Sequence, residues 1–227
     1  NGTLLWSRSF TLENPNSFDR PSDMKIDISG YIYITGTSHV LDDKYMTLKI
    51  DPLGYLYWSK YYDSPFGDNA QFLELDNSFN IYVTGISNNG TPDHYDITTI
   101  KYGPLANEIW VRRFEAPDLL NGNTCSLQLD SKGNVYVGGY CKRVSSLNDF
   151  TVLKYNSDGL LKWSGFYNSE YNGEDLSYAM AVNSAGEIYM AGQKQITGNQ
   201  YRCLTIKMDS TGQLIWENII NGSGSGK

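Results

Sequence analysis

The chain has 227 residues, of which 25 are acidic and 18 are basic, giving a net charge of −7. Apart from Arg112 and Arg113 the basic residues are scattered singly, which argues against a nucleic-acid surface because such a surface needs a clustered basic stripe. No apolar run approaches the roughly 18 residues that a membrane-spanning helix requires. The 18 Tyr, 8 Phe, 5 Trp and 22 Gly favour many short β-strands joined by turns.

The chain opens on a segment, residues 4–10, that has the pattern of the last strand of a repeat. Residues 214–220 have the same pattern and close the chain, so one of the two strands is surplus. Either a closed ring uses only one of them, or the repeats belong to a larger ring or an arc that another chain continues. A spare strand facing a vacant edge is also suited to strand exchange between subunits.

The residues between these ends repeat with a period of about 52 residues. Successive tryptophans lie 52, 52, 53 and 53 residues apart, a glycine closes one strand of every repeat, and a tyrosine lies three residues before that glycine. Such regularity predicts a tandem-repeat fold. The repeated residues are Trp6, Trp58, Trp110, Trp163 and Trp216, then Tyr33, Tyr82, Tyr136 and Tyr189, and finally Gly36, Gly85, Gly139 and Gly192.

Each repeat divides into four short segments in which polar and apolar residues alternate. In the second repeat these segments are residues 71–75, 81–85, 97–102 and 109–114. Alternation over so few residues predicts β-strands rather than helices. Four antiparallel strands in a repeat of this length predict one blade of a β-propeller. We therefore predict an all-β protein, a propeller of four four-stranded antiparallel blades with one surplus outer strand.

The turn between the first two strands of each repeat has its own signature. An Asp or Asn is followed three residues later by glycine, as in Asp27 and Gly30, where a positive φ is needed. The second repeat departs from this pattern, because Phe79 replaces the glycine. We expect a single domain over residues 1–227, excerpted from a longer chain, with repeats near 1–43, 44–94, 95–148 and 149–200 and a partial repeat over 201–227.

These patterns also resemble a known family. The succession W-x-x-x-[FY], D-x-x-G-x-[IV]-Y-[VIM]-x-G and [DY]-x-x-[TL]-[IVL]-K-[YIM] is similar to the SBBP-type propeller repeat of bacteria and archaea, and it recurs four times over nearly the whole chain. The resemblance implies a β-propeller and an extracellular or cell-surface location, since such repeats occur mostly in secreted and surface proteins. It implies no set of catalytic residues.

Loops that differ between repeats are expected on one face of the propeller. They join the fourth strand to the next first strand, and the second strand to the third. Variable loops on a rigid scaffold are the usual place for binding, so we expect a protein or glycan ligand on this face, or further copies of the chain. The loops cover residues 11–21, 63–70, 115–123 and 168–176, and residues 37–44, 86–95, 141–148 and 193–200.

Three aspartates, Asp19, Asp68 and Asp175, occupy the same place in the first set of loops, whereas the third repeat has Gly122 there. If their carboxylates ring one mouth of the propeller channel, they suit a hard cation such as calcium. The alternative is that each carboxylate only accepts hydrogen bonds from backbone N–H groups at the bend. We expect no other cofactor.

Two further pairs of residues are expected to meet across strands. Lys49 and Trp58, and their counterparts nine residues apart in the other repeats, are predicted to pack between blades, with an aromatic binding slot as the alternative. Cys125 and Cys141 lie almost symmetrically about a predicted hairpin. They could form a disulfide in a secreted protein, and two buried free thiols are the alternative.

The sequence has no phosphate-binding loop, no G-x-S-x-G motif and no metal-ligand spacing, and its two histidines, His39 and His94, fall in predicted loops. We therefore predict that the chain is not an enzyme but a non-catalytic extracellular or cell-surface module that binds or adheres through its variable-loop face. One alternative is a building block of a surface fibre or layer, assembled by exchange of the terminal strands. Another is a carboxylate hydrolase that uses Asp68 and Asp175 at the channel mouth.

Overall fold

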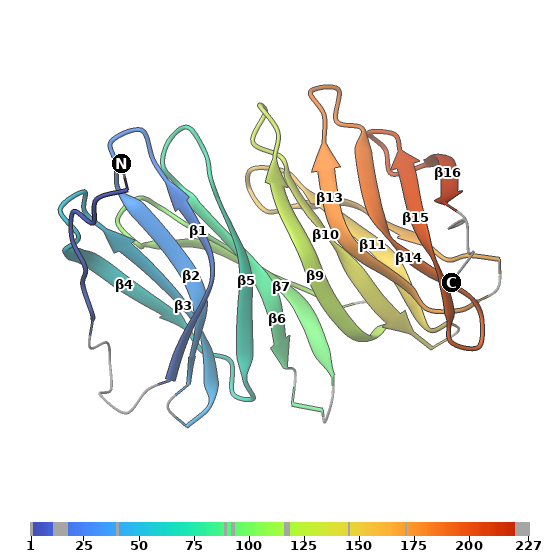
Figure 1. Cartoon of the computed structure of the whole chain (residues 1–227), viewed down its shortest axis with the longest axis horizontal. Helices are drawn as coiled ribbons and strands as arrows, with labels where there is room; N and C mark the ends of the chain where they lie inside the picture. Colours follow the sequence, from blue (N-terminus) through green and yellow to red (C-terminus); the bar gives the residue numbers. More distant parts are fainter. Residues whose placement is uncertain are drawn as a thin grey trace. The chain divides into compact units, whose positions relative to one another are not determined.

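The computed structural model describes residues 2–10, 18–39, 41–88, 90–91, 94–115, 119–144, 146–170 and 172–220. Its sixteen strands form four four-stranded antiparallel sheets in a propeller-like fold (Figure 1). The predicted all-β class is therefore confirmed. None of the described residues belongs to a helix long and apolar enough to cross a membrane. Contacts along the chain divide it into two compact units, Asn1–Arg113 and Phe114–Lys227.

Unit 1 contains two sheets, blade 1 and blade 2, whose strands pair in chain order. The first strand of blade 2 packs against the first three strands of blade 1, around a core that includes Tyr33, Tyr45 and Leu73. Blade 1 comprises β1 (Phe18–Ile26), β2 (Ile32–His39), β3 (Asp43–Ile50) and β4 (Leu56–Tyr62), and blade 2 comprises β5 (Asp68–Leu75), β6 (Ile81–Asn88), β7 (Tyr95–Tyr102) and β8 (Glu108–Phe114).

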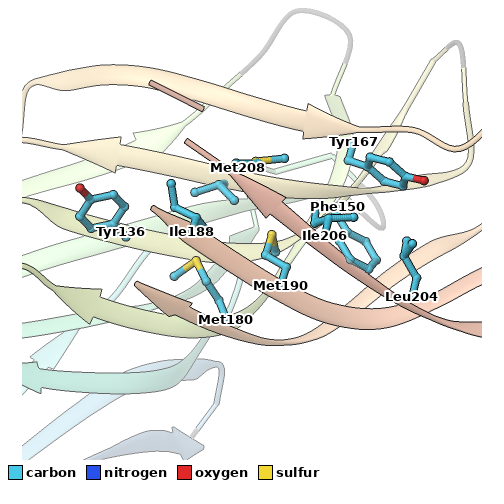
Figure 2. Packing of buried hydrophobic residues seen from close by; sticks show 10 residues of the cluster. Tyr136, Phe150, Tyr167, Met180, Ile188, Met190, Leu204, Ile206 and Met208 are labelled. Atoms are coloured by element: carbon cyan, nitrogen blue, oxygen red, sulfur yellow. The ribbon is translucent and has the colours of Figure 1, made fainter. Parts of the chain in front are cut away.

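Unit 2 repeats this arrangement with blade 3 and blade 4. Figure 2 shows the buried side chains between them, including Phe150, Met180, Met190 and Ile206, which come from strands of both blades. Blade 3 comprises β9 (Leu119–Leu129), β10 (Val135–Arg143), β11 (Asn148–Tyr155) and β12 (Leu161–Tyr167), and blade 4 comprises β13 (Asp175–Val182), β14 (Ile188–Thr197), β15 (Gln200–Met208) and β16 (Leu214–Ile220).

The glycine that recurs in the second strand of every blade faces a very close backbone. A Cβ atom built on Gly85 would lie 2.0 Å from the carbonyl oxygen of Asn69 on β5, where that strand is irregular. The corresponding distances are 2.0 Å at Gly36, 1.9 Å at Gly139 and 2.1 Å at Gly192. Only a residue without a side chain allows the first and second strands to approach so closely.

The repeated tyrosine, lysine and tryptophan form a row across each blade. In blade 1, Lys49 lies between Tyr33 and Trp58 in the strand register, so the predicted facing of Lys49 and Trp58 is confirmed. The lysine Nζ lies 4.9 Å from the centroid of the Tyr33 ring. That ring makes a T-shaped contact with Trp58 at a centroid distance of 6.4 Å. The Tyr33 hydroxyl donates a hydrogen bond to Asp27 at 3.1 Å, which ties the row to the turn.

The second repeat keeps the geometry of this turn without its glycine. Phe79 has a φ of 62°, close to the φ of 84° at Gly30 in the first repeat. For a residue with a side chain this left-handed conformation costs about 1–2 kcal/mol. The turn is held nevertheless, because the Phe79 N–H donates to the carbonyl of Asp76 at 2.9 Å.

The predicted surplus strand at residues 4–10 is wrong. This segment has no regular secondary structure, because no described strand pairs with its backbone. Its tryptophan still contacts blade 1, since a Cβ atom on Gly54 would lie 2.8 Å from the Trp6 indole. Trp58 contacts the corresponding turn of blade 2 by donating its Nε1–H to the Pro104 carbonyl at 3.3 Å. The segment therefore keeps the tryptophan contact of an outer strand but not its hydrogen-bond ladder.

Candidate functional site

Two neighbouring pockets lie on the variable-loop side of unit 1. The acidic pocket has a volume of about 280 Å³. The arginine pocket has a volume of about 320 Å³ and shares three lining residues with the first. The acidic pocket is lined by His39, Leu41, Asp42, Asp43, Phe66, Gly67, Asp68, Asn69, Ile86 and Tyr95, and the arginine pocket by Phe18, Arg20, Thr37, His39, Asp43 and Asn69.

Hydrogen bonds next to the acidic pocket hold part of its wall. The Asn88 N–H donates to the Gly67 carbonyl at 2.9 Å, and the Asn88 side-chain oxygen accepts from the Gly90 N–H at 2.8 Å. The Phe66 ring covers Gly90 so closely that a Cβ atom there would lie 2.6 Å from it. These contacts hold Gly67 and the Phe66 ring, both of which line the pocket.

Asp68 is the buried acid of this pocket, with a relative exposure of 1%. Its Oδ2 atom accepts a hydrogen bond from the Ser64 N–H at 2.5 Å. Its Oδ1 atom is buried and has no hydrogen bond of regular geometry, and Ser87 lies opposite it in the strand register. Burial raises the pKa of Asp68, although the Ser87 hydroxyl and Ser64 oppose the rise. A carboxyl group with a raised pKa on a pocket wall is a candidate proton donor.

A histidine–aspartate pair stands where the two pockets meet. The Nδ1 atom of His39 lies 2.7 Å from Oδ1 of Asp43, and the side chains are 54% and 50% exposed. An ionised carboxylate only accepts hydrogen bonds, so Nδ1 carries the proton and Nε2 of the neutral ring is an acceptor. The pair can therefore take up a proton at Nε2 while Asp43 stabilises the resulting charge.

The three aspartates singled out in the sequence are not loop residues. Asp68 and Asp175 begin β5 and β13, and Asp19 lies in β1, because the strands extend beyond their predicted ends. Asp68 and Asp175 accept hydrogen bonds from the backbone N–H groups of Ser64 and Ser169. Such bonds were the alternative to calcium binding in the sequence analysis. Asp19 and Asp68 belong to unit 1 and Asp175 to unit 2.

Asp19 accepts a hydrogen bond from the Ser38 hydroxyl at 2.6 Å, and the loop that precedes it lies outside the described residues. Within the described parts of the chain, no three His, Cys, Asp or Glu side chains gather closely enough to hold a metal ion. A calcium ion therefore stays a prediction from the sequence pattern.

Unit 2 contains a group of buried charges on the loop side of blade 4. Asp175 and Asp149 are 0% and 1% exposed, and Lys194, opposite Asp175 in the register, is 1% exposed. The lysine Nζ lies 3.9 Å from Glu217. Burial raises the pKa of Asp175 to about 6; the Ser169 N–H and the charge of Lys194 lower it, and the charge of Asp149 raises it. Of this group only Asp175 could be singled out from the sequence, because the members come from four strands.

The predicted disulfide between Cys125 and Cys141 is not formed, and both are free thiols. Cys141 lies opposite Gly122 in the register, whereas Cys125 falls at the irregularity of β9 opposite Gly138 and Gly139. The offset along the strands keeps the two sulfur atoms apart. Cys125 instead places its sulfur 3.5 Å from the Ser177 hydroxyl.

The three thiols should differ sharply in reactivity. Cys203 is exposed and should react with a thiol reagent at once, whereas Cys141 is fully buried. Burial raises the pKa of Cys125 to about 11, which keeps the reactive thiolate scarce at neutral pH. We expect one fast-reacting thiol in the native protein and three after unfolding, measured with Ellman's reagent without reductant. Only one thiol after unfolding would show that the disulfide exists.

Comparison with known proteins shows the fold. No protein-family model matches the sequence. No curated protein sequence is similar to it. Among solved structures, an ACO/RPE65 chimera matches with a TM-score of 0.51 at 12% identity, over 90% of this chain and 50% of that one. A mutant apocarotenoid oxygenase (ACO) from Synechocystis matches with a TM-score of 0.51 at 13% identity, over 89% and 49%. The chain thus spans about half the length of these structures.

These matches correct the predicted function. Identities of 12–13% show a shared fold alone and transfer neither a substrate nor a cofactor. The non-catalytic binding or adhesion module was predicted because the repeat carried no catalytic residue set. The fold is now seen to be shared with an oxygenase, which is an enzyme, so that prediction is wrong. Neither adhesion nor assembly into a surface fibre finds support in the matched structures.

Proposed function

We propose that the acidic pocket of unit 1 binds a small molecule through a positively charged amine, with the His39–Asp43 pair as the group that exchanges a proton with it. The main support is the pocket wall, in which Asp42, Asp43 and Asp68 border one space. Carboxylates that line one cleft concentrate cations there. A hydrogen bond between a charged carboxylate and an ammonium group contributes about 1.5–3 kcal/mol.

Two aromatic side chains favour the same ligand chemistry. Phe66 and Tyr95 line the acidic pocket together with the aliphatic side chain of Ile86. An ammonium group over an aromatic face gains about 0.5–2 kcal/mol, more when water is excluded. The volume of about 280 Å³ lies at the lower end of the range of small-molecule sites, which favours a ligand of roughly one ring.

The His39–Asp43 pair is the proton-transfer group of this pocket. An amine arrives as an ammonium ion and must lose a proton before its nitrogen can attack anything. His39 can accept that proton at Nε2, because Asp43 holds the proton on Nδ1.

Titration calorimetry with benzylamine tests this site, with benzyl alcohol as a neutral ligand of the same shape. Benzylamine is expected to bind, and the substitution Asp43→Asn is expected to weaken it by about tenfold, or ~1.4 kcal/mol. Benzyl alcohol should bind at least about tenfold more weakly than benzylamine to the unchanged protein.

Asp158→Asn is the matched control, since it removes one negative charge from an exposed turn of unit 2. It should leave benzylamine affinity unchanged. Equal losses in the two variants would show that only the net charge of the protein attracts the amine. Equal affinity for amine and alcohol would also contradict the proposal.

A further inference from the structure

The arginine pocket presents the opposite charge next to the acidic pocket. Arg20 on β1 lines this pocket, and its guanidinium carbon lies 4.8 Å from the centroid of the Phe18 ring. Stacking on an aromatic ring holds the guanidinium plane while its N–H edge stays available to an acceptor. Thr37, which is buried and lies opposite Arg20 in the register, also lines this pocket.

The two pockets are parts of one continuous surface. His39, Asp43 and Asn69 line both of them, so a ligand of sufficient length can contact both pockets at once. The charged residues of unit 1 therefore divide between the two pockets. Asp42 and Asp68 line only the acidic pocket, and Arg20 lines only the arginine pocket. Asp43 lies between them with the histidine and the amide.

We infer that the ligand of unit 1 is bipolar, with its amine in the acidic pocket and a carboxylate bound by Arg20 in the arginine pocket. This inference rests on the proposed function, because it places the amine where that function does. A carboxylate is the natural partner of the planar guanidinium, which donates two parallel N–H bonds to its two oxygens. Thr37 supplies a further hydroxyl donor.

The test compares benzylamine with 4-(aminomethyl)benzoate, which is the same molecule with a carboxylate at its far end. The bipolar ligand is expected to bind about tenfold more tightly than benzylamine. Arg20→Gln should reduce that ratio to about one. A second pair, hexylamine and 6-aminohexanoate, repeats the comparison with a flexible spacer, so that the result does not depend on one ligand length.

Arg143→Gln is the matched control, because Arg143 is also stacked on an aromatic ring, 4.6 Å from the centroid of Phe166, but belongs to unit 2. This variant should keep the tenfold ratio. The inference of a bipolar ligand is overturned if the amines bind but the added carboxylate of neither bipolar ligand increases the affinity. It is also overturned if the tenfold ratio is unchanged in Arg20→Gln. In both cases the proposed amine site stands. If neither the amines nor the bipolar ligands bind, both are overturned.

Discussion

Replacing Gly85 with alanine is expected to lower the free energy of unfolding by about 3 kcal/mol or more. The added Cβ atom would lie 2.0 Å from the carbonyl oxygen of Asn69 and 2.9 Å from the Cα atom of Ala70. Both contacts are with backbone, which cannot rotate away as a side chain can. The strands must therefore separate inside the core of blade 2, where their hydrogen bonds would be lost. Urea unfolding followed by tryptophan fluorescence measures the change.

Gly165→Ala is the control for this substitution. Gly165 lies within β12, and the nearest atoms to its added Cβ would be 3.5 Å away, which is ordinary contact distance. Its unfolding free energy should change by no more than about 0.5 kcal/mol, or rise slightly because the unfolded chain becomes stiffer. If both variants were equally mild, the repeated glycines would not be required by strand spacing.

Replacing the buried Lys194 with methionine should cost about 3 kcal/mol at pH 7, because it leaves buried carboxylates without their cation. Lys194 is 1% exposed, lies opposite Asp175 and faces Glu217 at 3.9 Å. Methionine has a similar volume, so loss of charge rather than a cavity causes the effect. The exposed Lys142 on β10 is the control, and Lys142→Met should change stability by less than about 0.5 kcal/mol.

The pH dependence of the free energy of unfolding identifies the carboxylate on which the charge of Lys194 acts. The pKa of Asp175 is about 6 in the folded chain, above its ordinary value of 3.8, so the folded state holds the proton more tightly than the unfolded state. The contribution of this group to stability is therefore full below about pH 4 and is lost as the pH rises to about 6, by roughly 1–2 kcal/mol. Asp175→Asn should remove this slope.

In Lys194→Met the same carboxyl loses the cation that favours its charged form, so the cost of the substitution should shrink as the pH falls from 7 to 5. Chemical unfolding at several pH values measures both variants. A cost of Lys194→Met that is the same at pH 5 and pH 7 would show that its charge does not act on Asp175.

The repeat pattern was sufficient to predict the blades, because each strand position has its own requirement. Gly85 is needed where strands approach closely, and Tyr33, Lys49 and Trp58 form a row across one blade. Such requirements recur four times and are visible without an alignment. The opening segment at residues 4–10 misled the prediction, because Trp6 keeps its packing contact although no strand pairs with the backbone.

The candidate site could not be predicted in the same way, since it depends on differences between repeats. Asp68 was identified from its repeated position, as a cation ligand or as a carboxylate of a hydrolase at the channel mouth, but not as a buried acid of a pocket within unit 1. Arg20, Asp42 and Asp43 occur in only one repeat, and nothing in their spacing distinguishes them from solvated loop residues. Their proximity follows from the loops of blades 1 and 2, whose conformations the pattern does not determine.

The amine site is tested most directly by nuclear magnetic resonance of the histidine rings during a benzylamine titration. The chain has only two histidines, which His94→Gln assigns. His39 lines both pockets, whereas His94 lies 3.3 Å from Asp96 and lines neither. The proposed site requires the His39 signals to move in a saturable manner while those of His94 stay in place. Movement of the His94 signals alone, or of neither histidine, would contradict it.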